Sequence, residues 1–136
     1  MRQYLLDTSV ISELRKTRPH GAVVAWISAM EAGRLSLSAV TLGELQVGIE
    51  RARRQDPAKA NEIERWIDGL PTYYHVLPMD TACFREWGRI MDKKPPELLQ
   101  DAMIAATARV HRLIVATRNE RDFKQLEVRT FNPFKS

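Results

Sequence analysis

The sequence of 136 residues has little of what several common protein classes require. It contains one cysteine, Cys83, so neither an internal disulfide nor a cysteine-based zinc site can form. Its three histidines are scattered without metal-binding spacing, and no Gly-rich nucleotide loop or nucleophilic-serine motif is present. The longest apolar run covers residues 22–27, far below the ~20 residues that span a bilayer. We therefore expect a cytoplasmic protein with no membrane partner.

The residues that are present indicate one folded domain, residues 1–136, with a mildly basic surface. Only six glycines and seven prolines occur, which argues against a disordered or repetitive chain. There are 21 basic and 17 acidic side chains, a net charge of +4, and arginine predominates among the basic residues. Because the planar guanidinium pairs well with phosphate oxygens, a polyanionic partner is as reasonable as an ordinary solvated surface.

Short strand patterns alternate with helical ones along the chain. We expect strands at residues 3–6, 34–38, 74–77, 113–117 and 128–130. We expect helices at 9–16, from 19 onward, at 41–54, from 57 to a stop at Gly69 and Pro71, after Asp80, at 99–111, and a turn or helix at 120–125. Such alternation favours a parallel sheet with helices on both faces, in which ligands gather at the carboxyl ends of the strands.

Four acidic residues occupy strand-to-helix junctions or adjacent helix starts in this pattern: Asp7, Glu44, Asp101 and Asp122. Taken singly, each has a plain structural explanation. Asp7 or Asp101 can cap a helix, Glu44 can form a capping box with Thr41, and Asp122 can pair with a neighbouring arginine in a turn. Taken together, carboxylates that converge on one sheet edge repel one another and must bind protons or a cation.

An oxygen-only ligand set of this kind favours a hard cation, Mg²⁺ or Mn²⁺. An ion held by carboxylates can bind a phosphate oxygen, activate a water and stabilise a leaving oxygen. A basic surface around such a site would attract a nucleic-acid backbone. The pattern therefore points to phosphodiester hydrolysis.

Four ordered segments carry a family resemblance: Leu-Leu-Asp-Thr-Ser at 5–9, and residues 38–45, 101–108 and 117–123. They resemble PIN-domain nucleases, and more narrowly the VapC-type toxins of type II toxin–antitoxin pairs. The FitB-like branch of these toxins often ends in Asn-Pro-Phe, as residues 132–134 do here. The resemblance implies a three-layer α/β/α sandwich around a five-stranded, mainly parallel sheet.

The resemblance also implies an activity and partners. A protein of this kind would be a Mg²⁺- or Mn²⁺-dependent endoribonuclease, a homodimer, and a target of a VapB-type antitoxin. By position, the implied metal ligands and catalytic acids are Asp7, Asp101, Glu44 and Asp122, supported by Thr8, Ser9 and Asn119. The charged stretch at 93–97 is longer than expected for the family and leaves the loop that would select substrate undefined.

Two other functions remain open at this point. A receiver-like phosphoacceptor domain also gathers carboxylates at parallel strand ends, although it needs adjacent acids where this chain has Asp7-Thr8-Ser9. A non-catalytic nucleic-acid-binding module of the same fold is the second alternative, and the four acids argue against it.

Overall fold

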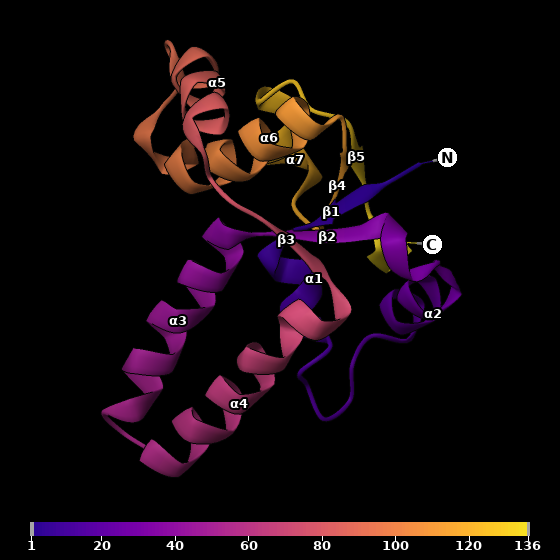
Figure 1. Cartoon of the computed structure of the whole chain (residues 1–136), viewed down its shortest axis with the longest axis vertical. Coiled ribbons are helices and arrows are strands. Elements are labelled where there is room, and N and C mark those ends of the chain that lie inside the picture. Colours follow the sequence, from indigo (N-terminus) through magenta and orange to yellow (C-terminus); the bar gives the residue numbers. More distant parts are fainter. Residues whose placement is uncertain (1, 136) are drawn as a thin grey trace.

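The computed structural model describes residues 2–135, which form a parallel sheet between two layers of helices (Figure 1). The strands are β1 (Tyr4–Leu6), β2 (Leu35–Ser38), β3 (His75–Leu77), β4 (Ile114–Ala116) and β5 (Thr130–Phe131). Their order is β3-β2-β1-β4-β5, and every pairing is parallel. The expected fold class is therefore confirmed. Because β1 has β2 on one side and β4 on the other, the chain reverses its direction of winding at the centre of the sheet.

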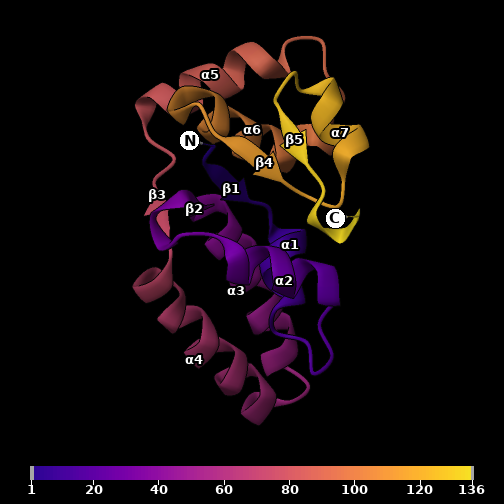
Figure 2. The same ribbon diagram turned by 90° about the vertical axis from the view of Figure 1, so that its right-hand side faces the viewer.

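The helices divide between the two faces of the sheet (Figure 2). One layer contains α1 (Thr8–Glu13), α2 (Gly21–Ala29), α3 (Ala39–Arg53) and α4 (Pro57–Tyr73). The other contains α5 (Thr81–Met91), α6 (Leu99–His111) and α7 (Glu120–Gln125). Short 3₁₀ turns occupy η1 (Ala32–Arg34), η2 (Pro96–Leu98) and η3 (Pro133–Lys135).

Each face of the sheet packs against its own apolar core. Tyr4 and Leu6 contribute to the core beneath α1–α4, whereas Leu5, between them, contributes to the core beneath α5–α7. This division follows from the two-residue period of a strand, which sends successive side chains to opposite faces. Cys83 is fully buried, as expected for a small core residue.

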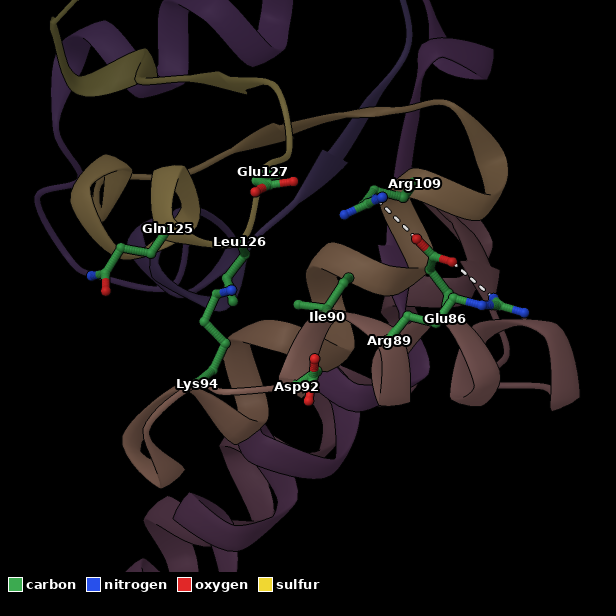
Figure 3. A pocket seen from close by; sticks show the side chains of 9 residues that line it. All are labelled: Glu86, Arg89, Ile90, Asp92, Lys94, Arg109, Gln125, Leu126 and Glu127. Carbon is green, nitrogen blue, oxygen red and sulfur yellow. Dashed lines mark hydrogen bonds and ion pairs between the residues drawn. The ribbon is translucent and has the colours of Figure 1, made fainter.

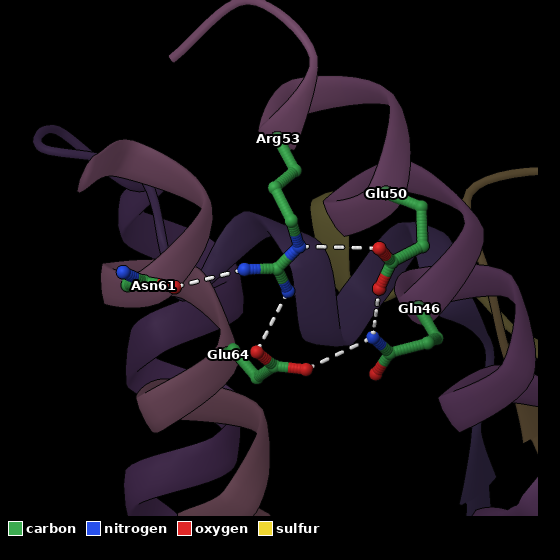
Figure 4. Close-up of polar contacts among 5 residues, drawn as sticks. All are labelled: Gln46, Glu50, Arg53, Asn61 and Glu64. Atoms are coloured by element: carbon green, nitrogen blue, oxygen red, sulfur yellow. Dashed lines mark hydrogen bonds and ion pairs between the residues drawn. The ribbon is translucent and has the colours of Figure 1, made fainter. Parts of the chain in front are cut away.

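Helices α3 and α4 form an antiparallel pair that extends away from the sheet, and one arginine joins them (Figure 4). The guanidinium of Arg53 donates to Glu50 of its own helix at 3.1 Å and to Glu64 of α4 at 2.7 Å. Gln46 Nε2 donates to the same two carboxylates, at 2.7 and 3.0 Å. Because these groups are largely solvated, the network fixes the relative position of the helices more than it adds stability.

Several expected element boundaries are wrong. Helix α4 does not stop at Gly69 and Pro71: the amide of Tyr74 still donates to Leu70 O at 3.0 Å. Helix α2 begins at Gly21, two residues later than expected, and β5 begins later than the expected residue 128. The expected cap of α5 is confirmed, since Asp80 accepts a hydrogen bond from the amide of Cys83. Among the described residues no helix has the length and apolarity needed to cross a membrane.

Candidate active site

Asp7 is the first residue after the central strand. Its amide donates to Ala116 O at 2.9 Å, which continues the pairing of β1 with β4. Its carboxylate is buried, and Oδ2 accepts hydrogen bonds from Ser9 Oγ at 3.0 Å and Thr117 Oγ1 at 2.8 Å. Although Asp7 occupies the N-cap position of α1, its side chain does not cap the helix. The capping explanation for Asp7 is therefore wrong, and two hydroxyls hold the carboxylate toward the sheet edge.

Glu44 faces α1 rather than the end of its own helix. Ser38 caps α3 by accepting from the amide of Val40, so the helix begins before Thr41 and the expected capping box does not form. The Thr8 hydroxyl instead donates to Glu44 Oε1 at 3.0 Å. Burial raises the pKa of Glu44, the Thr8 hydrogen bond partly opposes this effect, and the charge of Asp7 adds to it.

Asp101 and Asp122 are joined through a side-chain amide. Asn119, in the segment after β4, donates from Nδ2 to Asp122 Oδ2 at 2.8 Å, and the same nitrogen lies 3.4 Å from Asp101 Oδ2. The backbone N–H of Asn119 donates in turn to Thr117 Oγ1 at 2.9 Å. Asp101 lies in the first turn of α6 and does not cap it. The capping explanation for Asp101 is therefore wrong. Within residues 2–135, Asp122 accepts a hydrogen bond from Asn119 instead of pairing with an arginine in a turn.

The four acids act on one another electrostatically. The pKa of Asp101 is raised to about 6, first by burial and then by the negative charges of Asp7, Asp122 and Glu44. Burial and the neighbouring negative charges thus both disfavour the charged form of this carboxyl group. The structure thus brings together, from four separate segments, all seven residues selected from the sequence: Asp7, Thr8, Ser9, Glu44, Asp101, Asn119 and Asp122.

Two threonines at this edge were not selected from the sequence. Thr117 is fully buried and connects Asp7 to the Asn119 backbone, and buried Thr41 lies 3.2 Å from the Thr8 hydroxyl. The sequence feature that identifies Thr117 is its polar side chain at the end of an otherwise apolar strand. Such a residue faces the edge where ligands gather.

The donor set suits a hard divalent cation, because every candidate ligand is a carboxylate oxygen. Asp7, Glu44, Asp101 and Asp122 are the residues that could hold it. As the side chains stand, no group of three His, Cys, Asp or Glu residues within 2–135 is arranged to hold a metal ion. The neutral side-chain amide of Asn119 donates hydrogen bonds between Asp101 and Asp122.

Fold and site together define a parallel α/β protein whose polar centre is built where the winding of the sheet reverses. Within that class, the chain belongs to the PIN-domain family, whose model matches residues 4–128. The VapC ribonuclease Y4jK of Sinorhizobium fredii is 36% identical over 96% of both chains. Toxin FitB of Neisseria gonorrhoeae is 34% identical over 96% of this chain and 97% of its own.

Solved structures agree with the sequence relatives. The crystal structure of FitAcB from Neisseria gonorrhoeae superposes with a TM-score of 0.86 at 31% identity, covering 98% of this chain and all of that one. Structural neighbours of this kind are toxin–antitoxin complexes, some of them bound to DNA. These relatives do not favour the receiver-like alternative.

Proposed function

We propose that this chain is the toxin of a type II toxin–antitoxin pair and a Mg²⁺- or Mn²⁺-dependent endoribonuclease. The observation that carries the proposal is the cluster of four mutually repelling carboxylates at the carboxyl edge of the sheet, with the pKa of Asp101 raised to about 6. Two relatives that match this chain along nearly its whole length support the proposal: the name of the VapC ribonuclease supports the reaction, and the name of the FitB toxin supports the toxin assignment.

Within this proposal, each side chain has a defined task. A divalent cation, when bound, supplies Lewis-acid activation of the phosphodiester and of a water. Asp7 is oriented as a ligand by the Ser9 and Thr117 hydroxyls, so little reorganisation is needed at that carboxylate. Asp101 is the carboxylate most ready to hold a proton when no cation is present. Asn119 keeps Asp101 and Asp122 together and positions them at the entrance to the site.

The proposed partners follow from the same relatives. We propose a VapB-type antitoxin that inhibits the chain, an RNA substrate, and a homodimer as the toxin's own assembly. Co-expression with a small antitoxin encoded beside this chain should relieve the growth arrest that the chain causes alone. Absence of both arrest and copurification would contradict the toxin assignment.

Cleavage of RNA by the purified chain tests the enzymatic part directly. We expect Mg²⁺ or Mn²⁺ to support cleavage, EDTA to stop it, and Asp7→Asn to reduce it by at least about a hundredfold, as loss of an oriented charge at a reacting centre does. Asp68→Asn, which neutralises an exposed carboxylate on α4, is the matched control and should cleave like the parent. Undiminished cleavage in EDTA and by Asp7→Asn would show that another site or a contaminant is responsible.

A further inference from the structure

The edge of the sheet opposite the acids is lined with arginine. Arg2, Arg34, Arg112 and Arg129 lie one or two positions before β1, β2, β4 and β5. Because all five strands are parallel, these positions meet at a single edge. The sheet therefore has acidic residues where its strands end and basic residues where they begin.

Backbone contacts hold this basic edge together. The Arg34 guanidinium donates to Arg2 O at 2.7 Å, and the amide of Val115 in β4 donates to Arg129 O at 2.9 Å. Arg112 ends α6 in a left-handed conformation, with φ 57° and ψ 45°, which turns the chain into β4. The positions of these arginines are thus fixed by the pairing of the strands rather than by a flexible loop.

A hollow opens between three of these side chains. It has a volume of about 370 Å³ and is lined by Arg2, Gln3, Arg112, Ile114 and Arg129, with no carboxylate. A second hollow, of about 210 Å³, shares Arg112 and Arg129 and adds another arginine and one glutamate. The two hollows form a continuous basic surface along the edge.

These arginines lack counter-ions. Within residues 2–135, Arg2, Arg112 and Arg129 take part in no salt bridge. A neighbouring hollow between α5, α6 and α7 differs in this respect (Figure 3), because Glu86 pairs with both Arg89 and Arg109 at 3.0 Å. That hollow is also lined by two further acids, so its charges balance. Among the described residues, the larger hollow at the sheet edge is lined by basic charges alone, whereas the hollow beside α5 has as many acids as bases.

Helix dipoles explain only part of this arrangement. Arg112 lies at the C-terminal end of α6, where a cation is favourable. Arg2 precedes the first strand and follows no described helix. A dipole explanation therefore leaves Arg2 unaccounted for, whereas binding of a polyanion accounts for the whole set.

We propose that Arg2, Arg112 and Arg129 form a second phosphate-binding surface, which holds the backbone of RNA segments lying outside the cleavage site. The choice of RNA rests on the proposed ribonuclease function. Guanidinium groups pair bidentately with phosphate oxygens, and adjoining hollows suit a chain of regularly spaced charges better than one isolated anion. An acidic protein fits less well, since protein interfaces need an apolar centre and the one apolar residue lining the larger hollow, Ile114, is buried.

RNA binding without cleavage tests this surface. The probe is a labelled single-stranded RNA of about 30 nucleotides, long enough to reach beyond one binding groove, titrated in EDTA. We expect the double variant Arg112→Gln/Arg129→Gln to bind about tenfold more weakly at 0.1 M salt. Its salt dependence, as the slope of log K against log salt, should fall by about 1.4, which corresponds to two lost phosphate contacts.

Two control variants and a second probe separate the possible outcomes. Arg65→Gln/Arg85→Gln removes the same charge from exposed helix positions and should bind RNA like the parent. Arg112→Lys/Arg129→Lys keeps the charge and should recover most of the affinity. Equal RNA affinity for the parent and the Arg112→Gln/Arg129→Gln variant would overturn the proposal, even if the parent cleaves RNA.

Tighter binding of poly-glutamate than of RNA would overturn the proposal in favour of an acidic protein partner. A parent that binds RNA through these arginines yet cleaves none would instead refute the ribonuclease and leave the surface standing. The two proposals therefore fail in distinguishable ways.

Discussion

Replacing Asp101 by asparagine should make the metal-free protein more stable while it removes a proposed metal ligand. The pKa of this carboxyl rises from its ordinary 3.8 to about 6 in the folded chain. For an acid, a raised folded-state pKa means that folding disfavours the charged form. The resulting penalty is absent below pH 3.8, grows between pH 3.8 and 6, and is complete above that range.

The size of the penalty follows from the two pKa values. At pH 8 it amounts to about 3 kcal/mol, and at pH 5 to about 1.5 kcal/mol. Because Asp101 is not fully buried, solvent screens part of this energy, and we expect Asp101→Asn to gain about 1–3 kcal/mol at pH 8. In a chain of 136 residues, this gain raises Tm by roughly 4–12 °C. The asparagine oxygen can still accept the weak hydrogen bond from Asn119.

Thermal unfolding in EDTA at pH 5 and pH 8 measures this gain, with Asp68→Asn as the exposed control expected to change stability by less than about 0.5 kcal/mol. Addition of Mg²⁺ at a hundred times its Kd should stabilise the parent by about 2.7 kcal/mol and the variant by much less, which narrows or reverses the difference. An Asp101→Asn protein that is no more stable than the parent at pH 8, or whose gain is the same at pH 5, would refute the conclusion that folding disfavours the charged form of Asp101.

Three further outcomes follow from individual contacts. Thr117→Val should lower the free energy of unfolding in urea by about 1–3 kcal/mol and slow RNA cleavage, because the Asp7 carboxylate loses its 2.8 Å donor. Thr117→Ser keeps the hydroxyl and should preserve stability and cleavage. Equal losses in the two variants would contradict this role. Phe134→Ala removes the ring that lies 3.8 Å from the Arg118 guanidinium, so Tm should fall by a few degrees, and an unchanged Tm would show that the contact is not stabilising. Burial raises the pKa of the Cys83 thiol, so Ellman's reagent should label it only after unfolding; rapid labelling of the folded chain at pH 8 would show that this core opens.

The positions of Asp7 and Asn119 could be predicted because they depend on strand order, whereas Glu44 and Asp101 lie in α3 and α6 and reach the same edge through the packing of those helices. In an all-parallel sheet, every residue that directly follows a strand lies at the same edge, whatever the exact strand boundaries are. Errors of one or two residues in β1 or β4 therefore did not move Asp7 or Asn119 to another face. The alternation of Tyr4, Leu5 and Leu6 between two cores is equally local, since it requires only the two-residue period.

The failures occurred where tertiary packing overrides a local signal. Pro71 has no amide hydrogen and should end a helix, yet it lies in the last turn of α4, and beyond it the amide of Tyr74 still donates to Leu70 O. The buried side chains of the neighbouring residues Ile67 and Leu70 pack this turn against the core, and this packing outweighs the helix-breaking effect of the proline.

Glu44 shows the same limit at the site itself. The spacing of Thr41 and Glu44 matches a capping box, but Ser38 caps the helix three residues earlier. Because Ser38 already caps the N-terminus of α3, Glu44 is available to accept a hydrogen bond from Thr8 in α1. A contact between residues 36 positions apart cannot be read from a four-residue pattern, because it depends on how α1 and α3 pack side by side on one face of the sheet.

The net charge of +4 is a sum over two edges of opposite sign. Strands of three or four residues separate those edges by only about 10–13 Å of backbone. An RNA held at the arginine edge must pass around the helices that cover the sheet before a phosphate farther along its chain approaches the acidic edge. Repulsion between that phosphate and the four carboxylates opposes this approach unless a cation is present. The basic edge would then supply affinity without metal, and the acidic edge would make productive placement depend on metal, so RNA binding and RNA cleavage should differ in their requirement for Mg²⁺.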